Sequence, residues 1–472
     1  MDKSAALGRL DAVFKAYDVR GTVPDQLDEA MAYAIGAAFA ALARRAAGAE
    51  RVVMGRDMRP SGTGLGGAFA AGVLSVGLGV VDAGMISTDM MYFASGHLDL
   101  PGVMLTASHN PARYNGLKLC LPGARPIGQE SGLGEIKQEA AEILSSLEGS
   151  PPAPAGDDGR IERVELLEAF AAHVHSFVDT GALSGLKVVA DTANGMGGLV
   201  APAVLGSLPF ELEILFQELD GNFPNHPADP IQPENLLFLK RRIEQTGADV
   251  GLAFDGDADR VFLVDERAEP LSGSLTTAIV AAAMLDAHPG ETVLYNLICS
   301  KAVPEVIAEH GGKGVRTRVG HSFIKAVMAE TGAVFGGEHS GHYYFRDNYR
   351  ADSGIIAALV VLSVISRASQ PLSQIRQPFE RYCDSGEINT EVADVSAVLA
   401  GVEKSFAEGG ASIDKLDGLT VDLGEWWFNL RPSNTEPLLR LNLEAPERAA
   451  MAGHLEEVMT LIRKLDRPAR RN

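Results

Sequence analysis

The amino-acid sequence predicts several α/β domains that are built on mixed or mostly parallel sheets. Short runs rich in Val, Ile and Leu end in polar or glycine-containing loops and are followed by Ala- and Leu-rich stretches with helical periodicity. This alternation is typical of α/β folds. The length of 472 residues exceeds what one hydrophobic core normally organises, and the hydrophobic fraction of 46% is enough for substantial cores. We therefore expect three or four domains.

The predicted strands fall into two groups. Residues 51–55, 187–191, 249–254 and 292–296 are the clearest members of the alternating pattern. The last hundred residues instead contain three runs, 418–424, 426–430 and 438–443, that resemble antiparallel strands beside helices. The C-terminal unit is therefore predicted to be α+β and distinct from the others.

Three stretches divide the chain. Residues 150–159 are rich in Pro, Gly and Asp, a turn at 265–270 follows a strand-like run, and two prolines within 370–378 follow a long helical pattern. We accordingly place the domains at residues 1–158, 159–268, 269–374 and 375–472.

Charge, cysteine content and the length of the apolar runs argue against several classes of partner and site. With 62 acidic and 41 basic residues the net charge is −21, which argues against a nucleic-acid or anionic-membrane partner. Three scattered cysteines without a CxxC pair indicate neither a disulfide framework nor a zinc site. The longest apolar run, near 355–365, is too short to span a bilayer. We expect a cytoplasmic protein; the oligomeric state cannot be predicted.

The segment DGDADR (255–260) places aspartates at every second position, so that one tight loop can point three carboxylates at a hard divalent cation. An EF-hand is rejected because Arg260 stands where that loop needs glycine and because the flanks are strand-like. An arginine beside a cation indicates instead that a phosphate oxygen completes the coordination and pairs with the guanidinium. A solvated acidic turn is the alternative.

The segment TASHNP (106–111) follows the apolar run 102–105 and pairs Ser108 with His109. It lacks a G-x-S-x-G elbow, so a serine hydrolase is poorly supported, and a serine that carries phosphate fits better. Lys118 lies ten residues further on and is a candidate acid or base if its pKa is lowered. Taken alone, Ser108 is better explained by a helix cap or turn hydroxyl, and Lys118 by a surface charge.

Two further segments suit the recognition of a phosphorylated sugar. In GEHSGH (337–342), Glu338 and Ser340 are predicted on the same side of an extended loop, where they can hold adjacent sugar hydroxyls. A metal-binding turn that uses His339 and His342 is the alternative. RPSNTEP (431–437) offers a guanidinium, hydroxyls, an amide and backbone N–H groups to a phosphate, and a polar hairpin turn is its alternative.

The four segments together supply a nucleophile, a carboxylate cage, a sugar-binding pair and an anion clamp, which phosphoryl transfer on a sugar requires. In this order they resemble the α-D-phosphohexomutases, and within that family the phosphomannomutase/phosphoglucomutase branch. The resemblance covers nearly the whole chain. It implies four domains around a central cleft, three similar α/β domains and a smaller, mobile C-terminal α+β domain.

The resemblance also implies site residues and cofactors. Ser108 would be a phosphoserine whose phosphate, with Asp255, Asp257 and Asp259, holds Mg²⁺. His109, Lys118, Arg260 and His321 would serve catalysis, with Lys118 and His321 as acid/base candidates. The substrate would meet Tyr17, Arg20, Glu338, Ser340 and His342, and its non-reacting phosphate would bind Arg431, Ser433, Asn434 and Thr435.

The implied reaction interconverts mannose 1-phosphate and mannose 6-phosphate through a hexose 1,6-bisphosphate that reorients in the cleft. Binding the sugar both ways round neglects C2, so glucose phosphates are expected substrates too, and phosphoglucomutase is the near alternative. GEHSGH favours this branch over phosphoglucosamine mutases, in which a GEQSGH-like loop is usual. A non-catalytic phosphosugar-binding protein and a phosphatase are the alternatives of other classes.

One residue departs from the family pattern. Related enzymes with dual mannose/glucose activity often carry a lysine in the segment that corresponds to 295–300, where this chain has Ile298. Lys301 is a candidate substitute for that lysine.

Overall fold

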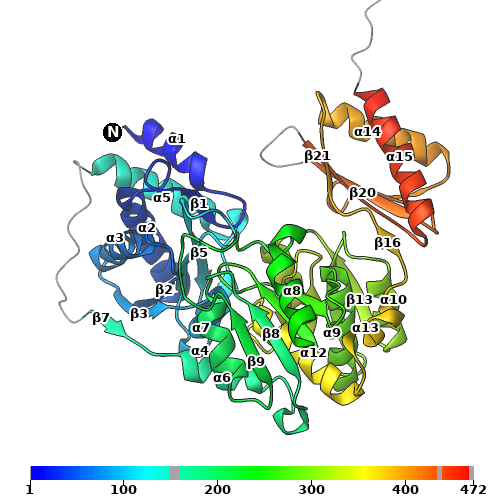
Figure 1. The fold of residues 1–472 in the computed structure, drawn as a ribbon. Helices are drawn as coiled ribbons and strands as arrows, with labels where there is room; N and C mark the ends of the chain where they lie inside the picture. The colour runs from blue at the N-terminus through cyan, green and yellow to red at the C-terminus, as the bar shows by residue number, and fades with distance from the viewer. Residues whose placement is uncertain (1, 148–159, 433–437, 467–472) are drawn as a thin grey trace, which may run out of the picture.

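The computed structural model describes residues 2–147, 160–432 and 438–466. Three α/β units are followed by a smaller C-terminal unit, and Figure 1 colours them from blue to red along the chain. Among these residues no single helix is long and apolar enough to cross a membrane. Helix α12 (Gly354–Ala368) meets that test only together with residues Leu372–Phe379, from which it is separated by a bend of 92°.

The first unit contains a seven-stranded sheet with the order β1-β5-β4-β2-β3-β7, and β6 pairs with β5. Strand β5 runs antiparallel to β1 and β4, whereas β4, β2, β3 and β7 are parallel. The strands are β1 Val19–Thr22, β2 Arg51–Arg56, β3 Gly79–Met85, β4 Gly102–Leu105, β5 Tyr114–Leu121, β6 Arg125–Pro126 and β7 Ile161–Arg163. The helices are α1 Lys3–Val13, α2 Glu29–Ala47, α3 Gly62–Ser75, α4 Thr88–Leu98 and α5 Leu133–Ser146, with a 3-10 turn at Gln129–Ser131.

Strand β7 is an edge strand of this first sheet. The expected boundary at residue 158 assigns it to the second domain, but it pairs in parallel with β3. Two flanking hydrogen bonds extend the pairing, from the Val80 amide to the Arg160 carbonyl at 2.8 Å and from the Val164 amide to the Asp82 carbonyl at 3.0 Å. The first unit therefore ends after β7. A three-residue strand is too short to show a periodic pattern in the sequence.

The second and third units are smaller α/β sandwiches. The second comprises β8 Lys187–Asp191, β9 Glu211–Leu215, β10 Val250–Phe254 and β11 Val261–Asp265, with α6 Leu167–His175, α7 Gly197–Leu205 and α8 Leu237–Thr246. The third comprises β12 Thr292–Asn296, β13 Lys313–Thr317, β14 Phe335–Gly337 and β15 Tyr343–Phe345, with α9 Gly273–Ala287, α10 Ala302–Glu309, α11 His321–Thr331, α12 and α13 Leu372–Ile375. The 3-10 turns are Thr180–Ala182, Pro233–Leu236 and Gln377–Phe379.

The three α/β units share one strand order. It reads β5-β4-β2-β3 in the first unit, β11-β10-β8-β9 in the second and β15-β14-β12-β13 in the third. In each, three parallel strands are followed by one antiparallel strand. The connection into that antiparallel strand holds TASHNP in the first unit, DGDADR in the second and GEHSGH in the third. Three of the four segments singled out in the sequence thus occupy equivalent positions in three similar folds.

Apolar packing joins these units. One cluster of buried side chains extends from Val53 in β2 through Leu252 in β10 to Phe335 in β14. A second cluster fills the other face of the first sheet, under α1, α2, α3 and α5. The C-terminal unit has a cluster of its own. The loops of the three α/β units are therefore held by a common core, whereas the C-terminal unit is built independently.

The C-terminal unit is an antiparallel sheet with the order β16-β21-β20-β19-β18, and β17 pairs with β21. Figure 1 shows α14 and α15 packed beside it. The elements are β16 Cys383–Asp384, β17 Ile388–Glu391, β18 Ser412–Asp414, β19 Leu419–Asp422, β20 Trp427–Pro432, β21 Leu438–Ala445, α14 Val395–Glu408 and α15 Arg448–Leu465. In β21, Leu439, Leu441 and Leu443 enter the core, so Arg440, Asn442 and Glu444 lie on the opposite face. This arrangement confirms the predicted α+β class.

Two glycines allow α2 and α3 to pack backbone against backbone. A Cβ at Gly36 would lie 2.3 Å from the Phe69 carbonyl oxygen, and a Cβ at Gly72 would lie 2.1 Å from the Tyr33 carbonyl oxygen. Neither contact can be relieved by turning a side chain. Both positions therefore require glycine.

Gly72→Ala should lower the free energy of unfolding by about 1–3 kcal/mol, because the helices must separate to admit the methyl group. Gly67→Ala in the same helix is the matched control, since a Cβ there meets nothing within 4 Å. It should be neutral or stabilising by up to about 1 kcal/mol. Thermal unfolding monitored by circular dichroism measures both, and equal shifts for the two variants would contradict this account.

Candidate active site

Ser108 is held in a strained turn between β4 and β5. Its φ is 50°, in the left-handed region that residues other than glycine seldom adopt. The Ser108 amide donates to Thr106 Oγ1 at 2.9 Å, and the Ser108 hydroxyl donates to Asp255 Oδ2 at 2.8 Å. The side chain belongs to the first unit and its acceptor to the second. The turn thus presents the hydroxyl to the DGDADR loop.

Arg59 holds this turn through hydrogen bonds to its main chain, although no sequence motif includes this residue. Its side chain is fully buried and its Nε donates to Asp57 Oδ2 at 3.1 Å. Its two terminal nitrogens donate, at 2.7–2.9 Å, to the carbonyl oxygens of Ser108, Asn110, Pro111 and Tyr114. Burial lowers the pKa of Arg59 while Asp57 opposes that shift. The only available signal was its position just after β2, at the carboxyl end of a parallel strand.

The three aspartates of DGDADR form a buried cage. One carboxylate oxygen from each of Asp255, Asp257 and Asp259 lies within 4.8 Å of the others, and all three side chains are buried. Asp257 Oδ1 and Asp259 Oδ1 are buried without a hydrogen-bond partner. Buried carboxylate oxygens are the ligands that hard divalent cations prefer. The residues therefore fit a divalent metal.

Two cations partly neutralise the cage, and a hydroxyl donates a hydrogen bond to it. Lys118 Nζ lies 3.0 Å from Asp257 Oδ2 and 2.6 Å from Asp259 Oδ2. Arg260 Nε donates to Asp255 Oδ2 at 2.9 Å, and Thr88 Oγ1 donates to Asp257 Oδ2 at 2.6 Å. Lys118 and Thr88 come from the first unit, whereas the acids come from the second. The cage is thus closed across the boundary between two units.

The charges shift the pKa values of these groups. Burial disfavours the Lys118 ammonium, but Asp257 and Asp259 raise the pKa of Lys118 well above its usual range. The lowered pKa expected of a lysine base is therefore not found here. Burial raises the pKa of Asp255, although Arg260 opposes the shift. Asp257 goes the other way: against the effect of burial, Lys118 and Thr88 lower its pKa.

His109 and Arg260 lie beside the Ser108 hydroxyl. Arg260 Nη2 is 2.6 Å from His109 Nδ1 and 3.3 Å from Ser108 Oγ. Burial, and then the charge of Arg260, lower the pKa of His109 to about 2. The imidazole is therefore neutral near pH 7, and the guanidinium is the positive group nearest to the hydroxyl on this side.

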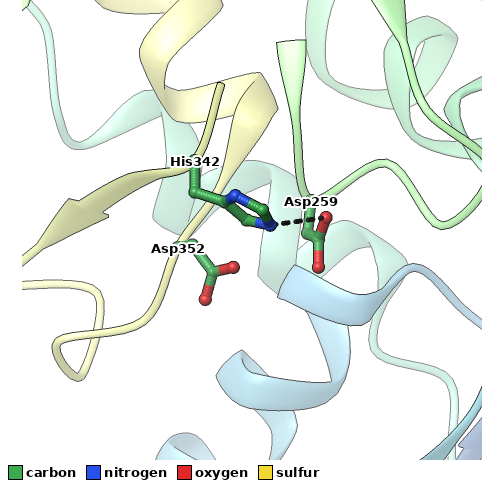
Figure 2. Close-up of side chains that lie close together, drawn as sticks. All are labelled: Asp259, His342 and Asp352. Atoms are coloured by element: carbon green, nitrogen blue, oxygen red, sulfur yellow. Dashed lines mark ion pairs between the residues drawn. The ribbon is translucent and has the colours of Figure 1, made fainter. Parts of the chain in front are cut away.

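Figure 2 shows a second group of potential metal ligands, Asp259, His342 and Asp352. His342 Nε2 lies 3.8 Å from Asp259 Oδ1. Asp352 Oδ1 lies 2.8 Å from Lys325 Nζ, and both of these side chains are buried. This group offers two carboxylates and one imidazole, whereas DGDADR offers three carboxylates. Hard divalent cations prefer oxygen ligands, so the three aspartates of DGDADR are the better candidate metal centre.

The GEHSGH segment forms a tight hairpin turn rather than the expected extended loop. The Glu338 amide donates to the His342 carbonyl at 3.0 Å, and Gly341 closes the turn with a φ of 85°. The buried Glu338 carboxylate accepts from Tyr344 Oη at 2.7 Å and from the Gly320 amide at 3.1 Å. Ser340 Oγ lies 2.9 Å from His342 Nδ1. The acid and the hydroxyl thus lie in one rigid turn.

Two of the sequence alternatives are not supported. No group of potential metal ligands among the described side chains contains both His339 and His342. His339 Nδ1 instead lies 3.0 Å from Ser274 Oγ. Related enzymes often carry a lysine in the segment where this chain has Ile298. Lys301 is not available to take the place of that lysine, because its Nζ donates to Asp422 Oδ1 and to the Gly424 carbonyl oxygen, both at 2.7 Å. It joins the third unit to the C-terminal unit.

The remaining predicted residues lie beside the Ser108 turn, in a separate cavity or outside the described part of the chain. Arg20 donates to Asn110 Oδ1 at 2.7 Å, next to the Ser108 turn. Tyr17 and Arg431 line one cavity of about 930 Å³, in which the first, third and C-terminal units meet. Ser433, Asn434 and Thr435 lie outside the described residues, as does the side chain of His321 at the start of α11.

Comparison with known proteins decides the family. Models of the phosphoglucomutase/phosphomannomutase domains match the chain in order: α/β/α domain I at residues 11–146, domain II at 166–269, domain III at 272–382 and the C-terminal domain at 387–461. The chain belongs to the phosphoglucomutase/phosphomannomutase family. The family and the four-domain architecture expected from the motifs are thereby confirmed.

Relatives of this family match the chain over nearly its whole length. A protein of Xanthomonas campestris that is named phosphohexose mutases is 39% identical over 95% of this chain and 99% of its own length. A phosphomannomutase of Methanocaldococcus jannaschii is 37% identical over 96% and 98%, respectively. The crystal structure of a family protein from Burkholderia thailandensis superposes with a TM-score of 0.86, at 30% identity over 97% and 98%.

Mn²⁺ binding, measured by titration calorimetry, separates the two candidate metal groups. Asp257→Asn should weaken binding by about tenfold or more, because a ligand oxygen loses its charge. His342 belongs only to the group shown in Figure 2, so His342→Ala should leave the affinity for Mn²⁺ nearly unchanged. The reverse result would place the metal between Asp259, His342 and Asp352.

Proposed function

We propose that this protein is a phosphomannomutase that interconverts mannose 1-phosphate and mannose 6-phosphate and also accepts glucose phosphates. The observation that carries the proposal is the position of the Ser108 hydroxyl, 2.8 Å from Asp255 Oδ2 and 3.3 Å from Arg260 Nη2. A hydroxyl between a metal-binding carboxylate and a guanidinium suits a phosphoryl carrier. The curated relatives named phosphomannomutase support the choice of sugar.

In this proposal Asp255, Asp257 and Asp259 hold Mg²⁺, which would offset the charge of a phosphate on Ser108 and polarise its phosphorus. Arg260 stabilises the negative charge of the transferring group. The neutral imidazole of His109 adds no competing charge. Phosphoryl transfer gains most of its rate from such positioning and charge stabilisation.

Phosphoserine 108 gives its phosphoryl group to the free 6- or 1-hydroxyl of a hexose phosphate. The oxygen of that hydroxyl bonds to phosphorus, the bond from phosphorus to Ser108 Oγ breaks, and the proton of the attacking hydroxyl passes to a base. The hexose 1,6-bisphosphate then turns round, and Ser108 takes back the other phosphoryl group. Lys118 and His321 remain the candidates for the base. A cation between Asp257 and Asp259 would lower the pKa of Lys118 towards that role.

Substrate recognition in this proposal rests on two groups of residues. Glu338 and Ser340, fixed in their hairpin turn, hold adjacent sugar hydroxyls. Arg431, with Ser433, Asn434 and Thr435, holds the phosphate that is not transferred, and Tyr17, Arg20 and His342 border the substrate. Phosphoglucomutase is the second candidate function, because contacts that tolerate both orientations of the sugar distinguish C2 poorly. We place the enzyme in the cytoplasm, with small phosphosugars as its partners.

The direct test is ³¹P NMR of the protein with Mg²⁺, catalytic glucose 1,6-bisphosphate and equal amounts of mannose 1-phosphate and glucose 1-phosphate. Appearance of 6-phosphates is the expected result, and their initial ratio gives the preferred sugar. Release of inorganic phosphate alone would favour a phosphatase. No change in the spectrum would favour a non-catalytic binding protein.

Ser108→Ala should abolish turnover without altering the thermal stability appreciably, because it removes the phosphoryl carrier but no apolar core atom. Ser75→Ala is the control, since its hydroxyl only donates within α3, to the Gly72 carbonyl at 2.6 Å. A coupled assay for glucose 6-phosphate measures both variants. Substantial turnover by Ser108→Ala would exclude Ser108 as the carrier.

A further inference from the structure

Helix α4 of the first unit begins in contact with the DGDADR loop of the second unit. Thr88, the first residue of the helix, is fully buried and contacts Asp257 at two points. The Thr88 amide donates to the Asp257 carbonyl oxygen at 3.0 Å, and the Thr88 hydroxyl donates to Asp257 Oδ2 at 2.6 Å. The first unit therefore holds both the main chain and the carboxylate of a candidate metal ligand.

The Thr88 hydroxyl is not needed by its own helix. A hydroxyl at the start of a helix ordinarily caps one of the free amides of the first turn. In α4 this cap is provided by Ser87, whose side chain accepts from the Met90 amide. The hydroxyl of Thr88 is therefore left for a group outside the helix, and its acceptor is the Asp257 carboxylate.

The two oxygens of the Asp257 carboxylate have different surroundings. Three donors of the first unit approach Oδ2: Thr88 Oγ1 at 2.6 Å, Lys118 Nζ at 3.0 Å and Thr106 Oγ1 at 3.3 Å. Oδ1 is buried and has no hydrogen-bond partner among the described residues. A buried carboxylate oxygen without a donor is costly unless a cation meets it. The carboxylate is thus turned with Oδ2 towards the first unit, which leaves Oδ1 for a metal ion.

Among these three donors, Thr88 is the one committed to Asp257. Lys118 Nζ also lies 2.6 Å from Asp259 Oδ2, so its charge is shared between two aspartates. The Thr106 hydroxyl is the most distant of the three, and it also accepts from a main-chain amide of its own turn. The Thr88 hydroxyl makes the shortest contact and donates to no other group in the described part of the chain. The orientation of the carboxylate therefore depends mainly on Thr88.

The start of α4 is itself firmly held. Asp89 accepts from the Ser87 hydroxyl, from the Met90 amide at 2.8 Å and from Ser353 Oγ at 2.7 Å. Ser353 is the N-cap of α12 in the third unit. Met90 enters the apolar cluster that joins the three α/β units. Thr88 thus projects from an element that is fixed by the third unit as well as by the first.

We propose that Thr88 is a positioning residue of the metal centre, whose hydroxyl holds the Asp257 carboxylate so that Oδ1 faces the divalent cation. The proposal rests on the metal centre of the proposed function and adds to it a residue outside the four sequence motifs. Partners that orient a metal ligand typically contribute about ten- to a hundredfold to metal affinity. Because Thr88 and Asp257 belong to different units, the affinity for the metal depends on the contact between those units.

Mn²⁺ titration calorimetry of the full-length protein tests this role. Thr88→Val removes the donor but keeps the shape of the side chain, and it should weaken Mn²⁺ binding about tenfold or more. Thr88→Ser keeps the hydroxyl and should bind Mn²⁺ nearly as tightly as the wild type. In a mutase assay, Thr88→Val should be slow at limiting Mg²⁺, and excess Mg²⁺ should restore most of the rate. A merely structural defect would not respond to excess Mg²⁺.

Thr277→Val is the matched control, because Thr277 is a buried threonine of α9 whose hydroxyl has no hydrogen-bond partner within the described ranges. It should bind Mn²⁺ as the wild type does, and thermal melts establish that the variants are folded. Equal affinities of Thr88→Val and the wild type would overturn the role of Thr88 and leave the metal centre in place. A wild type that binds no Mn²⁺ would contradict the metal centre, and the proposal with it. If Thr88→Val does not fold, Thr88→Ala and Thr88→Ser are compared, and equal affinities of these two would overturn the proposal.

Discussion

The mutual repulsion of three buried carboxylates is the constraint on which the rest of this structure depends. Asp255, Asp257 and Asp259 lie within one tight loop and are almost inaccessible to water. Buried charges persist only when other charges and hydrogen-bond donors surround them. The required partners come from two units: Lys118 and Thr88 from the first, Arg260 from the second. The apolar cluster that runs through the three α/β units holds these partners in position.

The way in which the three α/β units converge explains why the functional segments meet. Each unit contributes the connection that enters its antiparallel strand. Gly256 lies so close to the Ser108 carbonyl oxygen that a Cβ would approach it to 2.4 Å, and Arg260 forms a backbone bridge with His342. One topological position, used three times, thus supplies Ser108, the carboxylates of DGDADR and the GEHSGH turn, which we propose as the phosphoryl carrier, the metal ligands and the sugar-binding turn. The C-terminal unit has its own core and contributes Arg431 to the cavity that Tyr17 of the first unit also lines.

Sequence reasoning located whatever is encoded locally. The parallel strands, the polar loops after them and the carboxylates of DGDADR all follow from short patterns, and the structure places them together. It missed Arg59, whose partners are main-chain carbonyl oxygens about fifty residues away that no pattern of side chains marks. It made Lys118 an acid or base candidate on the condition of a lowered pKa, and it could not see the two aspartates that raise this pKa, because they lie 139 and 141 positions further along the chain. The roles of Ser433, Asn434, Thr435 and His321 stay predictions.

The most direct test of the account is to identify the residue that carries phosphate. The protein is incubated with glucose 1,6-bisphosphate and Mg²⁺, treated with a chelator, digested near neutral pH and analysed by tandem mass spectrometry. Neutral conditions preserve a phosphohistidine, so that phosphate on His109 would be detected as well as phosphate on Ser108. We predict close to one phosphate per chain, on Ser108. Phosphate on His109 or elsewhere, or a working mutase that never acquires phosphate, would contradict the account.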